Sequence, residues 1–169
     1  MALPRKLKNF NVFADGVSHV GEVEEITIPK LVRKVEEYRG GGMNGPVDID
    51  LGSEKLELET TYGGFMREPL KQYAVTGIDA TLVRFAGAYQ RDDTGAVDAV
   101  EVVVRGRHTE LDFGNAKAGE NSQFKVKSSL SYFKLTVNSE VWIEIDHANF
   151  IEVVFGVDRL AEQRRAMGL

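Results

Sequence analysis

The chain has 169 residues, of which 43% are hydrophobic and 28% are charged. This composition excludes wholesale disorder, and the length predicts one domain, residues 1–169, with a proper core. The absence of cysteine excludes disulfides, thiolate chemistry and cysteine-zinc sites. A net charge of −5 argues against nucleic-acid binding, which usually shows a basic face.

No apolar run approaches membrane-spanning length, and residues 1–10 lack the apolar region of a secretory signal. We therefore expect a soluble protein made in the cytoplasm.

The charge is unevenly distributed. Residues 1–14 carry Arg5, Lys6 and Lys8 and no acid, whereas residues 15–59 carry eleven acids and five bases. This asymmetry would suit head-to-tail attraction between copies, although an ordinary solvated surface is the favoured explanation.

The first third of the chain predicts short strands. Residues 9–28 predict a small meander around the hairpin signal Asp15-Gly16. Residues 31–38 carry charges in both phases, which fits an edge strand or a short helix, and we favour the strand. Residues 47–61 alternate apolar and polar side chains on either side of Gly52-Ser53.

A glycine-rich stretch, residues 39–47, predicts a flexible loop. Gly40, Gly42 and Gly45 match a dinucleotide-binding spacing, but a charged segment precedes them and Pro46 follows, so the match lacks its strand and helix. Two interpretations stay open, a plain loop and an extended arm that docks on a neighbouring chain.

The best internal helix signal covers residues 68–76. Pro69 suits a first helical turn, Leu70, Tyr73 and Ala74 form an apolar stripe, and Gly77 suits the end. We expect this helix to cover one open end of the core.

The strongest pattern is a long hairpin over residues 81–107. Asp92 to Gly95 suit a four-residue turn, so Arg91 faces Ala96. One face then carries Val83, Phe85, Val102 and Val104 and is dry. The other face is hydrophilic, and its members are Arg84, Ala86, Ala88, Gln90, Ala99, Glu101, Val103 and Arg105.

The second half predicts further strands. Residues 107–113 predict a separate strand, residues 123–137 a long strand with a bulge near Tyr132, and residues 150–155 a last strand. A short C-terminal helix follows, with Asp158 as its cap and Gly168 at its end. The expected fold class is mainly β: an antiparallel β-sandwich or open barrel with one internal short helix and a short C-terminal helix.

No residues form a catalytic pattern. His19, His108 and His147 are scattered, Asp146 and His147 are adjacent and point to opposite faces of a strand, and no serine lies in an exposed elbow. We expect no catalytic residue, no metal and no cofactor. The long strands have edges that another chain must cover, and the small side chains of the hydrophilic face would suit the inside of a wide shared barrel.

Several stretches resemble one family over nearly the whole chain: Met1–Lys8, Tyr38-Arg39-Gly40, Gly63-Gly64-Phe65, Arg84-Phe85-Ala86-Gly87, Tyr89–Gly95, Arg105-Gly106-Arg107, Glu144-Ile145-Asp146, Gly156–Leu160 and Arg164-Arg165 before Gly168-Leu169. The sequence resembles the major tail tube protein of contractile-tailed phages and the tube subunit of R-type pyocins, the pyocin version slightly more closely. The resemblance implies hexameric rings that stack into a hollow tube inside a contractile sheath, with each inner sheet joining its neighbours in a continuous barrel.

The same resemblance implies partners and a location. The partners are further copies, the sheath, baseplate or spike proteins and a terminator, and DNA traverses the lumen only in a phage. The target-cell membrane is met only through the assembled tube, after assembly in the bacterial cytoplasm and release as part of an extracellular particle.

Specific residues follow as expectations. Arg84, Gln90, Glu101 and Arg105 are candidates for lining the lumen, and the candidates for contacts between subunits or rings are Arg5, Lys6, Lys8, Gly42, Met43, Asn44, Val47 and Ile49. The alternatives are a tube component of a type VI secretion apparatus and a monomeric β-barrel that binds a small ligand.

Overall fold

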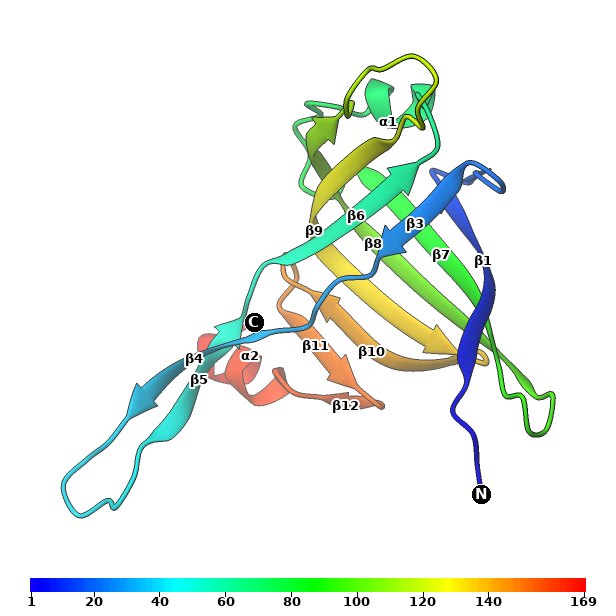
Figure 1. The fold of residues 1–169 in the computed structure, drawn as a ribbon. Helices are drawn as coiled ribbons and strands as arrows, with labels where there is room; N and C mark the ends of the chain where they lie inside the picture. The colour runs from blue at the N-terminus through cyan, green and yellow to red at the C-terminus, as the bar shows by residue number, and fades with distance from the viewer.

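The computed structural model describes residues 1–169 and confirms a mainly β, antiparallel fold. Ten strands form one sheet, and two strands form a separate hairpin that extends away from the body (Figure 1). The strands are β1 Lys6–Ala14, β2 Val17–Ser18, β3 Val23–Thr27, β4 Arg33–Tyr38, β5 Val47–Ser53, β6 Leu56–Tyr62, β7 Thr81–Gln90, β8 Val97–Asp112, β9 Phe124–Val137, β10 Glu140–Asp146, β11 Ile151–Val154 and β12 Val157–Asp158. The helices are α1 Arg67–Lys71 and α2 Ala161–Met167.

Strand β9 divides the large sheet into two parts. Its first half pairs with β6, which in turn pairs with β3, and its second half pairs with β10. Between the halves, Leu130 lies opposite Gly106 and Tyr132 opposite Arg105, so Ser131 is the extra residue of a bulge. The expected bulge near Tyr132 is therefore present, and it lets β6 and β3 turn over the sheet as a second layer.

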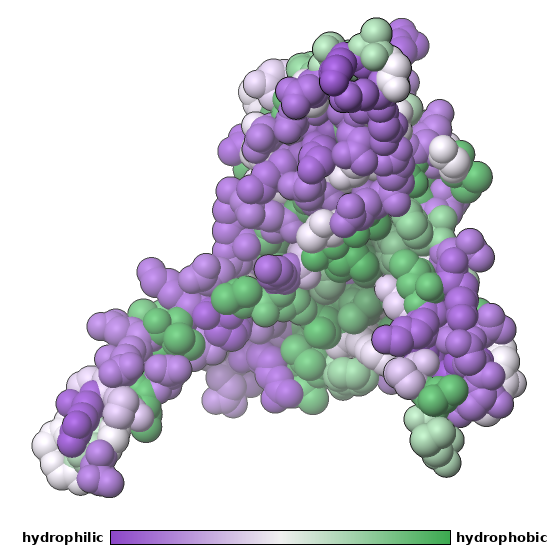
Figure 2. Space-filling view, viewed as in Figure 1, coloured by the Kyte–Doolittle hydropathy of each residue, from purple (hydrophilic) through white to green (hydrophobic).

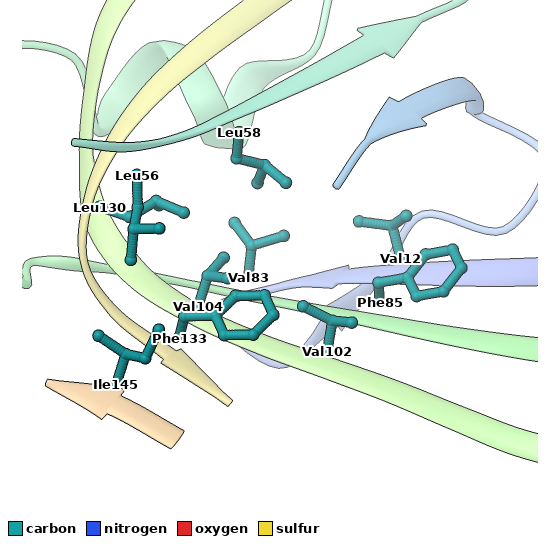
Figure 3. Packing of buried hydrophobic residues seen from close by; sticks show 10 residues of the cluster. All are labelled: Val12, Leu56, Leu58, Val83, Phe85, Val102, Val104, Leu130, Phe133 and Ile145. Carbon is teal, nitrogen blue, oxygen red and sulfur yellow. The ribbon is translucent and has the colours of Figure 1, made fainter. Parts of the chain in front are cut away.

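The core lies between these two layers. Its ten buried residues are Val12, Leu56, Leu58, Val83, Phe85, Val102, Val104, Leu130, Phe133 and Ile145. Leu56 and Leu58 point down from β6 toward side chains that rise from β1, β7, β8 and β9 (Figure 3). No strand pairing joins β3 to β1, so the two layers form an open barrel.

The central hairpin has the expected register and turn. Gln90 lies opposite Val97, the Arg91 amide donates to the Ala96 carbonyl at 3.0 Å, and Gly95 takes a φ of +72°. Val83, Phe85, Val102 and Val104 are buried, which confirms the dry face. The second arm, however, continues to Asp112, because β8 keeps pairing with β9 past a register shift after His108. The separate strand expected at residues 107–113 is thus wrong.

Two expectations fail near the N-terminal half. The meander stops after β2, since β3 pairs with β6 rather than with its sequence neighbour. The helix expected at residues 68–76 ends at Lys71, because Ala74 takes a φ of +64° and Tyr73 forms a bridge with His108. Only Pro69 of this segment is buried, so the apolar stripe does not cover the core.

The C-terminal segment differs in detail from the expectation. The last strand is β12, which follows β11 after a turn in which Phe155 and Gly156 both have positive φ. Helix α2 has Leu160 at its N-cap without a side-chain cap. Asp158 instead accepts from the Leu160 amide at 3.0 Å and pairs with Arg164, while Gly168 ends the helix in the left-handed conformation, as expected.

Candidate functional site

The hydrophilic face of the sheet carries charges that are held in place. Arg84 on β7 and Glu101 on β8 form an ion pair at 3.0 Å, and both side chains are partly exposed. The Arg84 guanidinium also lies 4.1 Å from the centre of the Phe13 ring on β1, a cation-π contact. Three adjacent strands are thereby linked across the face that points away from the core.

The other two candidate residues of this face lie at its ends. Gln90 donates from Nε2 to the Gly95 carbonyl at 2.9 Å, so it braces the hairpin turn. Arg105 is exposed and lies opposite Tyr132. The Tyr132 hydroxyl donates to Glu144 at 2.8 Å, and partial burial together with that carboxylate raises the tyrosine pKa above its usual range.

The β4–β5 hairpin, residues 33–53, forms a projecting arm (Figure 1). Every residue of β4 is exposed, and so are Val47 to Leu51 of β5. The register places Tyr38 opposite Val47 and Glu36 opposite Ile49, so one face carries an apolar strip of Tyr38, Val47, Ile49 and Leu51. At the tip, the Gly40 amide donates to the Met43 sulfur at 3.1 Å and Arg39 donates to the Met43 carbonyl.

Arg33 fixes the root of the arm to the body. Its Nε and Nη2 donate to the two carboxylate oxygens of Asp50 at 2.8 and 3.0 Å, and its Nη1 donates to Glu152 on β11 at 2.8 Å. These bonds raise the pKa of Arg33, and the hydrogen bonds from Arg33 and from the Gly52 amide lower the pKa of Asp50. A cavity of about 620 Å³ adjoins this joint, between the arm, the β10–β11 turn and α2.

The basic N-terminal segment is bound to the tip of its own central hairpin. Arg5 pairs with Asp98, Lys8 pairs with Asp92 at 2.8 Å, and the Leu3 amide donates to Asp93 at 3.1 Å. Sequence reasoning missed this contact, because the partners lie between 84 and 93 positions apart in the chain. The bonds from Arg91 and from the Leu3 amide lower the pKa of Asp93 to about 2.

The titratable side chains do not assemble into a chemical centre. His108 is buried between Ser128 and Gln72, and burial lowers its pKa. His19 contacts Glu22 at 2.7 Å, and His147 lies in the turn after β10. The structure contains no group of three or more metal-ligating side chains, and none of its helices is long and apolar enough to cross a membrane.

The fold and its surfaces therefore define a structural class: an antiparallel β protein whose outer sheet edges and arm are not covered by the rest of its own chain. The family follows from comparison with known proteins. The model of phage tail tube protein FII matches residues 4–168, so the chain belongs to this family of tail tube proteins.

Two relatives cover most or all of the chain. The tail tube protein of Escherichia phage P2 is 51% identical over 172 residues and covers 100% of both chains. The major tail tube protein of Serratia phage KSP20 is 39% identical over 153 residues, covering 89% of this chain and 88% of its own. The family is one of structural proteins of the phage tail.

Solved structures show the same fold at low identity. A chain of the PVC extracellular contractile injection system, in its extended sheath-tube complex, superposes with a TM-score of 0.58 at 12% identity, covering 75% of this chain and 87% of its own. A chain of the tube-terminating cap of the anti-feeding prophage gives 0.56, again at 12% identity and with the same coverage of 75% and 87%.

Proposed function

We propose that this chain is a non-enzymatic subunit of the inner tube of a contractile tail, and that six copies form a ring and rings stack into the tube. The observation that carries the proposal is the incomplete sheet. The chain belongs to the tail tube family. Strand β1 has an uncovered edge at one side of its sheet, and β11–β12 have an uncovered edge at the other side. Pairing these edges between copies would close a continuous barrel and remove the exposed edges.

The hydrophilic face would then line the lumen. The side of the sheet that turns away from the core carries Arg84, Gln90, Glu101 and Arg105. The residues between them include the small side chains of Ala86, Ala88 and Ala99, which would leave room for a channel. The opposite orientation would expose Val83 and Phe85 to a water-filled channel and would lose the favourable free energy of burying these apolar side chains.

Contacts between copies would come from projecting segments. The arm, with Gly42, Met43 and Asn44 at its tip and Val47 and Ile49 in its strip, would contact an adjacent subunit or ring. Among the N-terminal cations, Lys6 has no acidic partner within the chain and would contact a neighbouring copy directly. Arg5 and Lys8 bind the tip of the central hairpin, so they would contribute by holding that tip in position for a neighbouring copy.

The wider partners follow from the same role. We infer a surrounding sheath, a baseplate or spike and a terminator as partners, and assembly in the bacterial cytoplasm before release in a particle. Chains of the same fold belong to a sheath-tube complex, a tube-terminating cap and a baseplate. DNA would pass through the lumen in a phage and not in a pyocin.

The small-ligand barrel remains the alternative from another class. Its interior would have to be hollow, but ten buried side chains occupy the space between the layers.

The type VI alternative is disfavoured because the tail tube family matches nearly the whole chain. Negative-stain microscopy of concentrated protein tests the proposal: rings or tubes are expected, and uniform small monomers would contradict it.

Glu101→Lys tests the lumen placement. Both partners of the Arg84–Glu101 pair are about 40% exposed, so the loss of the pair should change the free energy of unfolding by about 1 kcal/mol or less. The reversal potential of tubes inserted in a planar bilayer under a KCl gradient should shift toward anion selectivity. Lys117→Glu, on an exposed loop, is the control. An unchanged reversal potential, or an unfolded monomer, would contradict the placement.

A further inference from the structure

The tip of the arm contains the pair Asn44-Gly45, and the rest of the chain does not hold either residue. Both residues are exposed, and the tip stands clear of the body in the space-filling view (Figure 2). The hydrogen bonds of the tip all involve Met43, which is bound by Arg39 and by the backbone of Gly40. Neither the Asn44 carboxamide nor the Gly45 amide forms a hydrogen bond within the chain.

This arrangement permits a reaction between the two neighbours. Rotation about the Cα–C bond of Asn44 brings the backbone nitrogen of Gly45 against Cγ of the Asn44 side chain. After most residues the next Cβ obstructs this approach, but glycine has no Cβ and reaches backbone conformations that other residues avoid. Because both reacting groups belong to adjacent residues, no second molecule has to be positioned for the attack.

The reaction is balanced with water as its only co-reactant. Base removes the amide proton of Gly45, and the nitrogen attacks Cγ of Asn44, so that an N–Cγ bond forms. The Cγ–Nδ2 bond then breaks, and the side-chain nitrogen leaves as ammonia with the proton that Gly45 gave up. Water opens the cyclic imide at Cγ to give aspartate, or at the main-chain carbonyl to give isoaspartate. No electron is transferred, so neither an oxidant nor a reductant takes part.

Two other asparagines show what the fold adds to the local sequence. Asn121 and Asn138 are both followed by serine. Asn138 is held at both ends of its carboxamide, because Oδ1 accepts from the Ala99 amide at 3.0 Å and Nδ2 donates to Asp98 at 3.0 Å. Asn121 is exposed and its carboxamide has no partner in the chain. The same local sequence is therefore restrained at one position and unrestrained at the other.

We propose that Asn44 is a site of spontaneous deamidation in the free subunit, with aspartate and isoaspartate as its products. Either product places a carboxylate on a hairpin in which Glu37 and Asp48 already lie opposite each other, and like charges in such positions are unfavourable. Isoaspartate also adds a carbon to the main chain just before Val47, where β5 begins. Free subunits therefore acquire an altered arm as they age, whether or not the chain serves as a tube subunit.

Peptide mapping by mass spectrometry tests the site on the full chain. The protein is kept at mildly alkaline pH and at a concentration too low for assembly. The peptide that contains Asn44 should show the mass change of an amide-to-acid exchange first, the Asn121 peptide later and the Asn138 peptide last. An isoaspartate-specific methyltransferase should label the Asn44 peptide as well.

Gly45→Ala provides the matched variant. A Cβ at Gly45 meets nothing within 4 Å, so the fold should be kept, which circular dichroism checks. Conversion of Asn44 should become slower by roughly tenfold or more, because the added Cβ obstructs the nitrogen and restricts its backbone. Gly41→Ala, at another tip position where a Cβ meets nothing within 4 Å, is the control and should leave the rate unchanged.

Each outcome decides for or against the site. Conversion of Asn44 before the other asparagines, slowed by Gly45→Ala and not by Gly41→Ala, supports it. Conversion of Asn44 no faster than that of Asn138 would overturn it, and so would equal rates in the two alanine variants. Microscopy of the unsubstituted protein tests the tube function separately, because none of these rates depends on assembly.

Discussion

The arm and the central hairpin have nearly the same kind of sequence but opposite surroundings. Both alternate apolar and polar side chains across a two-stranded ladder. In β7 every second residue from Thr81 to Gly87 is buried, whereas in β4 no residue is. The alternation therefore predicts a strand with two unlike faces, but it does not say whether the apolar face is covered by the same chain or by another.

The largest expected effect contrasts two leucines, one in each region. Leu56 is fully buried between the layers, and Leu56→Ala should lower the free energy of unfolding of the monomer by about 2–5 kcal/mol, through lost burial and a residual cavity. Leu51→Ala, on the exposed strip of the arm, should change it by less than about 0.5 kcal/mol. Chemical denaturation at concentrations too low for assembly measures both. Equal losses would mean that the arm is packed in the monomer.

The second-largest expected effect on stability contrasts two glycines, one in the body and one in the arm. A Cβ on Gly106 would lie 2.1 Å from the Ser129 carbonyl oxygen, where β8 and β9 approach each other at the bulge. Because that atom belongs to the backbone, Gly106→Ala should cost about 1–3 kcal/mol or more. Gly41→Ala at the tip of the arm meets nothing within 4 Å and should be nearly neutral. A well-tolerated Gly106→Ala would show that the two strands can separate at the bulge.

The smallest expected effect is a pH dependence that arises in the body and not in the arm. Burial lowers the pKa of His108 below about 6.5, its value in the unfolded chain. Below that pH the unfolded state takes up a proton that the folded state refuses, so stability should fall as the pH drops from 7 toward 5. His108→Gln should flatten this slope, while His147→Gln, at an exposed turn position, should leave it unchanged. Urea denaturation at a series of pH values measures the slope, and an identical slope in His108→Gln would exclude the histidine as its source.

Much of the local structure could be predicted because its causes are local. Gly95 and Gly16 both have positive φ, which glycine adopts without strain, and both hairpin turns are where the sequence places them. The change of apolar phase near Tyr132 gave the bulge. The helix predicted at residues 68–76 was too long, because an apolar stripe at helical spacing is weak evidence over only two turns. The bridge between Tyr73 and His108 takes the place of its second half.

The candidate surfaces were predictable to different degrees. The hydrophilic face followed from period-two alternation once the turn fixed the register, and Arg84 and Glu101 are indeed neighbours. Their position in a lumen stays a prediction, as do the contacts of the arm. The binding of Arg5 and Lys8 to the hairpin tip had no signal in the sequence, since nothing in a pattern of charges says which acid a distant cation will reach.

The sequence by itself determined most of the strands, the two hairpin turns, the hydrophilic face and the resemblance to tail tube proteins. Those features depend on side-chain alternation, on the few residues that tolerate positive φ, and on residues matched along the chain. The tertiary structure alone decided that β3 leaves its neighbour to pair with β6, that β6 pairs with β9 no further than Leu130, and that Arg33 binds Glu152 at the root of the arm. These features depend on contacts between residues far apart in the chain, where packing and charge geometry select one partner among many that the local pattern allows equally.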